Sequence, residues 1–146
     1  MTSIPSAPPT PSFIRPALAL LAGLGIMVLI YGFPTLIVTI ALLRGASDPT
    51  AFQPPVGFHV FTIVLGALGG GASGYAVARI TSGRSWYTLM LLALILCVSP
   101  VAEARKAASA GQPYWHLIAL AVLAPTGVLL GGVLERRRRP PLIATP

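Results

Sequence analysis

Residues 60–78 read VFTIVLGALGGGASGYAVA and contain no charged side chain. An α-helix needs about 20 such residues to cross the hydrocarbon layer of a bilayer, which is roughly 30 Å thick. Within this stretch Gly66, Gly70 and Gly74 are spaced four apart, so they share one face of a helix. A face without side chains lets a neighbouring backbone approach closely. The stretch therefore predicts a membrane-spanning helix that packs tightly against another helix.

Three further charge-free apolar stretches cover residues 16–43, 86–102 and 114–134. With residues 60–78 they predict an all-α integral membrane bundle of four transmembrane helices joined by short loops. The first stretch would be about 42 Å long at ~1.5 Å per residue, which exceeds the hydrocarbon thickness. We expect it to tilt, to protrude, or to break at Gly32-Phe33-Pro34.

The division into segments follows from these stretches. Residues 16–135 form the predicted membrane domain, and the polar segment 103–113 connects its last two helices. The proline-rich tail 1–15 is predicted to be disordered or extended. The segment 136–146 is predicted to be a basic, proline-containing tail.

The composition supports a membrane protein and excludes several soluble classes. Hydrophobic residues make up 55% of the chain and charged residues 9%, with a net charge of +7. A soluble domain carries about 25% charged residues. The positive charge therefore does not indicate a nucleic-acid-binding protein, and the expected partner of most of the surface is the lipid bilayer.

The basic residues predict the orientation. Four crossings put both termini on one side, and the connections then place seven of the ten basic residues on that side and three on the other. The positive-inside rule predicts that both termini are cytoplasmic. This prediction depends on the four-arginine run, which could also bind anionic lipid headgroups. The run comprises Arg136, Arg137, Arg138 and Arg139.

A second pair of glycines repeats the spacing of the first set. Gly127 and Gly131 lie four apart in the last predicted helix. Both sets predict glycine-zipper packing faces. The partner of each face is either another helix of this chain or a second subunit, and the sequence leaves both open.

Two histidines are the candidate ligand-binding residues. His59 and His116 lie at the starts of the second and fourth predicted helices, so both belong at similar depth on the side opposite the termini. Imidazoles at equal depth could bind haem iron or chlorophyll magnesium. Neither residue lies in a C-x-x-C-H or H-E-x-x-H pattern, and the alternative is an ordinary interfacial histidine.

Catalytic chemistry finds little support. The only acidic residues are Asp48, Glu103 and Glu135, and Glu135 is predicted on the opposite side from the other two. Cys97 is the single cysteine. No charged residue lies in the middle of a predicted helix, although such residues are the usual mark of ion coupling. We expect a protein that is not an enzyme and has no resident metal.

Several features resemble a loose group of small bacterial four-helix inner-membrane proteins that have no assigned activity. The resemblance covers about residues 60–135. It rests on the glycine-rich stretch running into Gly74-Tyr75-Ala76-Val77-Ala78-Arg79, the tight basic turn, Tyr114-Trp115, Ala124-Pro125 and Gly131-Gly132. It implies a four-helix fold and residence in the bacterial inner membrane, and it implies no activity.

The sequence thus favours an accessory or structural subunit of a larger membrane complex, associated with other membrane subunits or with itself. One alternative is a small channel or carrier for a neutral solute, which would need Thr62, Ser73 and Thr126 to line one path. The other is a subunit that binds haem or pigment through His59 and His116.

Overall fold

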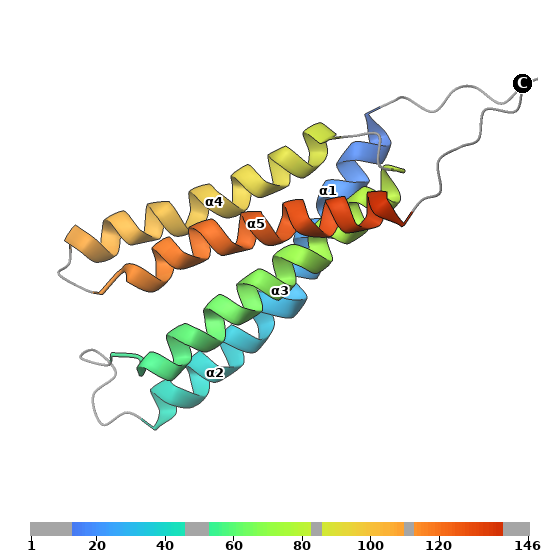
Figure 1. The fold of residues 1–146 in the computed structure, drawn as a ribbon. Helices are drawn as coiled ribbons and strands as arrows, with labels where there is room; N and C mark the ends of the chain where they lie inside the picture. Colours follow the sequence, from blue (N-terminus) through green and yellow to red (C-terminus); the bar gives the residue numbers. More distant parts are fainter. Residues whose placement is uncertain (1–12, 46–52, 83–85, 110–112, 139–146) are drawn as a thin grey trace, which may run out of the picture.

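The computed structural model describes residues 13–45, 53–82, 86–109 and 113–138, and these ranges are entirely helical apart from turns and short extended ends. Four helices within them are long and apolar enough to cross a membrane, which confirms the predicted all-α bundle. The first span consists of three consecutive segments and each other span is one helix (Figure 1). The segments are α1 (Ile14–Met27), the π-helix η1 (Val28–Gly32), α2 (Phe33–Arg44), α3 (Val56–Ile80), α4 (Trp86–Ser109) and α5 (Trp115–Arg137).

The first span does not break at the glycine–proline step. Residues Ile14–Arg44 form 31 consecutive helical residues. Pro34 has no N–H to donate, and its ring obstructs regular α-helical bonding. A π-turn precedes it, in which the N–H of Phe33 donates to the carbonyl of Val28, five residues back. The widened turn lets the helix continue past the proline.

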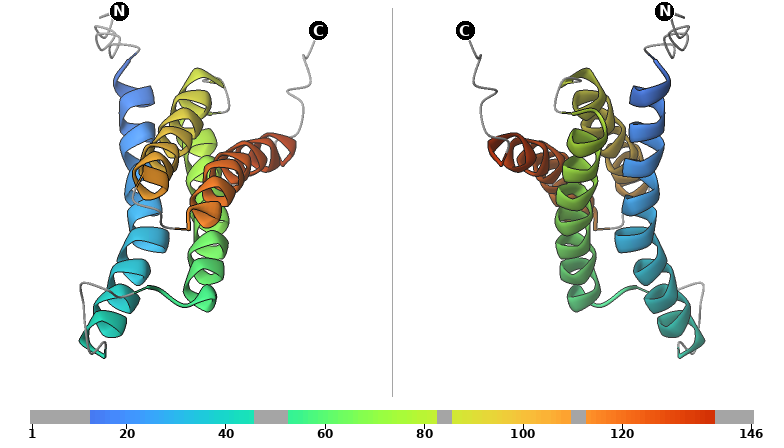
Figure 2. Two further views of the ribbon diagram at one scale, coloured as in Figure 1. Left: turned by 90° about the vertical axis from the view of Figure 1, so that its left-hand side faces the viewer. Right: turned by 90° about the vertical axis from the view of Figure 1, so that its right-hand side faces the viewer.

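The core of the bundle lies where α3 packs between α1 and α5, with α4 against α5. Its largest fully buried apolar side chains are Val77, Leu89, Leu92 and Val128. Figures 1 and 2 show α4 and α5 leaning away from α2 toward the end where α4 finishes and α5 begins. The bundle is therefore closed near the ends that lead to the two termini and spread apart at the opposite end.

Three segment boundaries differ from those expected. Glu103 and Lys106, predicted in a connecting segment, lie in the last turns of α4, which continues past Pro100 to Ser109. Arg136 and Arg137 likewise belong to α5 rather than to a tail. Arg15 similarly lies in α1, while Asp48, Arg84, Arg139 and the expected tails 1–12 and 139–146 lie outside the described residues.

The two glycine faces meet each other inside the chain. A Cβ added to Gly70 would collide with the carbonyl oxygen of Ala124, and one added to Gly74 with that of Val128. From the other side, a Cβ on Gly127 would lie 2.6 Å from the carbonyl oxygen of Ala67. On the same two faces, a Cβ on Gly131 would collide with the carbonyl oxygen of Gly71, and one on Gly66 with the side chain of Leu120.

Backbone contact between α3 and α5 thus requires glycine at Gly70, Gly74, Gly127 and Gly131, whereas at Gly66 the neighbouring atom belongs to a flexible side chain. Close approach of this kind gains dispersion contacts, which hold helices together where the surrounding lipid is as apolar as the side chains. The contact fixes α3 and α5 relative to each other, and so it sets the positions of the residues at their N-terminal ends.

Candidate binding cavity

The N-terminal turns of α3 and α5 bring the two histidines into contact. The imidazole rings of His59 and His116 stack with centroids 3.9 Å apart and an interplanar angle of 25°. His59 is 6% exposed. The ring of Trp115 lies edge-on to His59, with centroids 5.7 Å apart. The sequence predicted similar depth for the two histidines, and the structure places them side by side.

Local backbone structure holds each histidine near its helix start. Pro55 precedes α3 in an extended conformation, and its carbonyl accepts a hydrogen bond from the N–H of Phe58 at 2.9 Å. The carbonyl of Tyr114 accepts one from the N–H of Leu117 at 3.0 Å. These bonds close the first turn of each helix, so both imidazoles project from ordered backbone.

One nitrogen of each imidazole, the Nδ1 atom, lacks a hydrogen-bond partner in the part of the chain that the structure describes. The Nδ1 atoms of His59 and His116 are both shielded from solvent and unpaired there. The hydroxyl of Thr62 is not a partner, because it donates to the carbonyl of His59 at 2.8 Å. A buried polar atom without a partner costs about 1–3 kcal/mol. The histidine pair is therefore a polar site that a bound molecule would stabilise.

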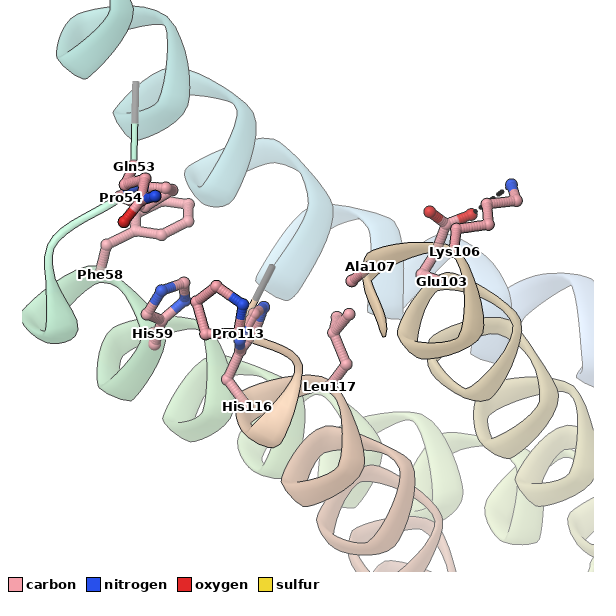
Figure 3. A pocket seen from close by; sticks show the side chains of 10 residues that line it. All are labelled: Gln53, Pro54, Phe58, His59, Glu103, Lys106, Ala107, Pro113, His116 and Leu117. Atoms are coloured by element: carbon pink, nitrogen blue, oxygen red, sulfur yellow. Dashed lines mark hydrogen bonds and ion pairs between the residues drawn. The ribbon is translucent and has the colours of Figure 1, made fainter. Parts of the chain in front are cut away.

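Both histidines line a cavity of about 510 Å³ between the starts of α3 and α5 and the end of α4 (Figure 3). Binding sites for small molecules commonly measure about 300–1,000 Å³. The chi2 torsion of histidine is broad, so a turn about the Cβ–Cγ bond can bring a ring nitrogen toward this space. The remaining lining residues are Gln53, Pro54, Phe58, Glu103, Lys106, Ala107, Pro113 and Leu117.

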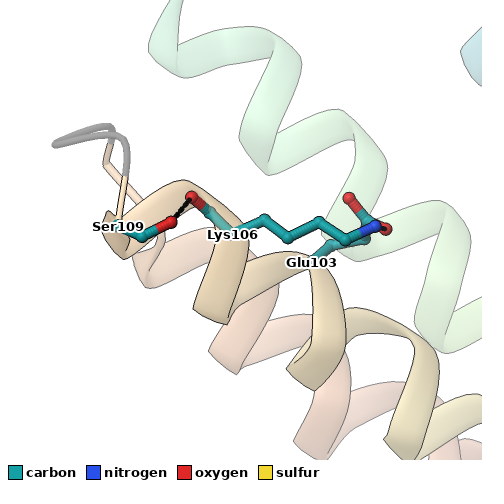
Figure 4. Close-up of polar contacts among 3 residues, drawn as sticks. All are labelled: Glu103, Lys106 and Ser109. Atoms are coloured by element: carbon teal, nitrogen blue, oxygen red, sulfur yellow. Dashed lines mark hydrogen bonds and ion pairs between the residues drawn. The ribbon is translucent and has the colours of Figure 1, made fainter.

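The two charged residues of the cavity are paired with each other. The Lys106 Nζ lies 3.0 Å from the Glu103 Oε1, one helical turn apart on α4 (Figure 4). The carbonyl of Lys106 also accepts a hydrogen bond from the Ser109 hydroxyl at 2.8 Å. Both charged side chains are more than half exposed, so the pair contributes little to stability. It does cancel the formal charge on this wall of the cavity.

A second cavity of about 150 Å³ adjoins the first and is largely apolar. The two cavities share Glu103 and Leu117 in their walls. Tyr31 of the π-turn forms part of the second cavity, so the irregular segment of the first span contributes to it. The other lining residues are Met27, Leu96, Ser99, Pro100, Leu120 and Ala124.

The stacked imidazoles do not fit a haem or chlorophyll held between them. A metal bound by two imidazoles on opposite sides has each nitrogen about 2.0–2.1 Å away, so the rings point at one another through the metal. The rings of His59 and His116 instead lie face to face. Among the described residues no group of three or more His, Cys, Asp or Glu side chains could hold a metal ion.

The hydroxyls expected to line a solute path do not gather in these cavities. Thr62, Ser73 and Thr126 line neither of the two. Thr126 donates to the carbonyl of Val122 at 2.7 Å, within its own helix. Hydroxyls of membrane helices commonly bond to their own backbone in this way.

Two arginines of the basic run, at the opposite end of the bundle, contact aromatic rings of the same chain. The Arg136 guanidinium lies 4.8 Å from the centroid of a Trp86 ring, and that of Arg138 lies 5.9 Å from the Tyr75 ring. Cation–π contacts at such distances are attractive. These arginines therefore tie the end of α5 to α4 and α3, in addition to any role in topology or lipid binding.

Sequence reasoning missed the walls contributed by Phe58 and Lys106, whereas it placed Glu103 on the same side of the membrane as the histidines, where it could join them. Glu103 and Lys106 are three residues apart, a spacing that allows an ion pair on a helix, but the sequence predicted a polar connecting segment here.

Comparisons of the chain with protein-family models, with curated proteins and with solved structures found no match.

Proposed function

We propose that this chain is a non-enzymatic, multi-pass membrane protein that binds a small molecule in the cavity beside His59 and His116. The proposal rests on one observation: His59 lines the cavity and is only 6% exposed, yet its Nδ1 atom has no hydrogen-bond partner among the described residues. A bound molecule with hydrogen-bonding groups would offset the cost of that buried polar atom.

The absence of a chemical step is part of the proposal. The one carboxylate among the described lining residues, that of Glu103, is already paired with Lys106. Acid–base catalysis needs groups placed to give and take a proton from a substrate. Two stacked imidazoles and a neutralised carboxylate suit binding better than turnover.

We place the protein in the bacterial inner membrane with both termini in the cytoplasm. In support, Arg15, Arg79 and Arg136 lie at the end of the bundle where α1 begins and α3 and α5 finish. Arg44 and Lys106 lie at the other end, where α2 and α4 finish. In this orientation the cavity opens toward the periplasmic side of the membrane.

Mass spectrometry of the protein extracted in mild detergent tests the proposal. A small molecule should co-purify with the wild-type chain in a fixed ratio and should be lost from a variant carrying both His59→Leu and His116→Leu. Thr126→Val is the matched control, because its exposed hydroxyl bonds only its own helix and lines neither cavity. If the double variant retained the same compound as the wild type, the compound would not be bound in this cavity.

One observation supports a second function, that of an accessory subunit. The first span buries only Ala19, Gly23 and Met27, all in α1, and buries no residue of η1 or α2. A helix of a partner protein could cover α2. The glycine faces do not support this reading, because α3 and α5 use them on each other. Native electrophoresis would show unrelated polypeptides of fixed stoichiometry if this function holds, and a lone chain or homo-oligomer if it does not.

A further inference from the structure

We infer that the molecule bound beside the histidines is a neutral amphiphile, with a flat, oxygen-bearing head in the first cavity and an apolar chain in the second. A quinone with a long side chain is the type of compound that has this chemistry. The inference rests on the proposed function and adds the class of ligand to it.

The charge of the first cavity favours a neutral head. Among the described lining residues, the two charged ones, Glu103 and Lys106, form an ion pair at 3.0 Å and cancel. The other polar groups of the described lining are the amide of Gln53 and the two imidazoles. An anionic headgroup would find no unpaired cation among these lining residues, whereas a carbonyl or hydroxyl oxygen would find hydrogen-bond donors.

The shape of the lining favours a flat head. Phe58, Pro54 and Pro113 present rings to the first cavity, and the stacked imidazoles form another ring surface. Planar groups pack on such surfaces in offset-stacked or edge-on arrangements. Figure 3 shows Phe58, His59, His116 and Pro113 facing the same space from the starts of α3 and α5.

The adjoining cavity supplies a place for the chain. It shares Glu103 and Leu117 with the first cavity and is also lined by Met27, Leu96 and Leu120. Each buried methylene of a ligand contributes about 0.8 kcal/mol. A polar cavity that shares a wall with an apolar one suits a molecule that is polar at one end and apolar at the other, with its chain passing the Glu103 and Leu117 side chains.

The two tryptophans of the chain provide a selective reporter. Trp115 lies against His59 and His116, with ring centroids 5.7 and 5.9 Å away, whereas Trp86 begins α4 at the opposite end of the bundle. Quinones quench tryptophan fluorescence at short range. The variant Trp86→Phe leaves Trp115 as the only tryptophan, and Trp115→Phe leaves Trp86.

The experiment titrates the purified full chain in detergent with a benzoquinone that carries a ten-carbon chain. We expect saturable quenching in Trp86→Phe, whose remaining tryptophan lies beside the histidines. We expect only weak, linear quenching in Trp115→Phe. Adding His59→Leu and His116→Leu to Trp86→Phe should abolish the saturation. Equal quenching of the two single-tryptophan variants would mean collision within the micelle and would overturn the inference.

A second variant tests the position of the chain. Ser99→Phe should fill the second cavity without touching the glycine faces, since Ser99 lines that cavity and lies on α4. The substitution should lower the affinity for the ten-carbon quinone about tenfold, which corresponds to losing the burial of roughly two methylene groups. The affinity for methylbenzoquinone, which has no long chain, should not change. An equal loss for both compounds, or none for either, would contradict the two-cavity arrangement.

Competition separates the inference from the function on which it rests. A hydroquinone with the same ten-carbon chain should displace the quinone and phosphatidylglycerol should not; the reverse would overturn the neutral head. If no quinone binds but a histidine-dependent compound still co-purifies, the ligand class is wrong and the binding function stands. If neither is observed, both fail.

Discussion

The imidazole of His59 lies flat against that of His116, with ring centroids 3.9 Å apart, although the two residues belong to different helices. The contact depends on backbone packing further along the same helices, where Gly70 meets the carbonyl of Ala124. Any side chain at that glycine would push α3 and α5 apart and would separate the rings. The packing face and the binding cavity are thus parts of one arrangement.

The glycine faces can be tested with one type of substitution at different sites. Gly131→Ala should destabilise the chain by about 1–3 kcal/mol, because the added methyl would collide with the backbone of Gly71. Gly25→Ala is the matched control, since a Cβ there meets no atom within 4 Å. In an open helical position, alanine in place of glycine is neutral or stabilises by up to about 1 kcal/mol.

Thermal unfolding in detergent, followed by circular dichroism, measures both variants. We expect the Tm of Gly131→Ala to fall and that of Gly25→Ala to stay or rise. The same Tm for the two variants would mean that α5 does not approach α3 as closely as described.

The sequence predicted the four spans because charge-free length alone decides whether a helix can cross a bilayer. It also placed Gly66, Gly70 and Gly74 on one face, because helical periodicity is fixed. It could not name the opposing helix, since any small-residue face is a suitable partner for another. Of the three alternatives for the long first span, a break at Gly32-Phe33-Pro34 does not occur, because a π-turn accommodates the proline within a continuous helix.

Replacing a histidine should separate stability from binding. His59→Leu removes a buried Nδ1 atom that has no partner among the described residues and replaces it with an apolar side chain. Removing an unpaired buried polar group is neutral or stabilising. In ligand-free protein we therefore expect an unchanged or higher Tm, whereas in protein purified with its compound the variant should melt below the wild type, because only the wild type is stabilised by the bound molecule. A markedly lower Tm of the ligand-free variant would mean that the imidazole is paired within the chain.

Pro34→Ala tests the role of the π-turn. Without the proline, an α-helical turn can form in place of the π-turn. That change shifts the register of the helix by one residue, about 100°, which would move Tyr31 out of the second cavity and the buried face of α1 (Ala19, Gly23 and Met27) out of the core. Both the Tm and the affinity for the ten-carbon quinone should therefore fall. A variant that binds as tightly as the wild type would remove Tyr31 from the site.

A double-mutant cycle tests the contact between Arg136 and Trp86. We expect a coupling free energy of about 0.5–1 kcal/mol from the cycle Arg136→Ala and Trp86→Leu, as for an exposed cation–π pair. Arg137→Ala with Trp86→Leu is the control cycle, and its coupling should be near zero. Equal coupling in both cycles would indicate a general effect of charge rather than the ring contact.

The candidate site was less accessible to sequence reasoning than the fold. The positions of His59 and His116 at helix starts gave their depth, but depth says nothing about rotation around each helix axis. Contact between the rings follows from the close approach of α3 and α5. Glu103 and Lys106 joined the cavity only because α4 continues past Pro100, where a polar segment was expected.

Nitrogen-15 NMR of the two imidazoles in lipid bilayers tests the central claim most directly. The chain, labelled at its only two histidines, would be compared in pure synthetic lipid and in the same lipid with an extract of the native membrane. The account predicts that the ring nitrogens of both His59 and His116 shift together when the extract is present, because one molecule binds beside both rings. Unchanged signals, or a shift at one histidine alone, would contradict a shared binding site.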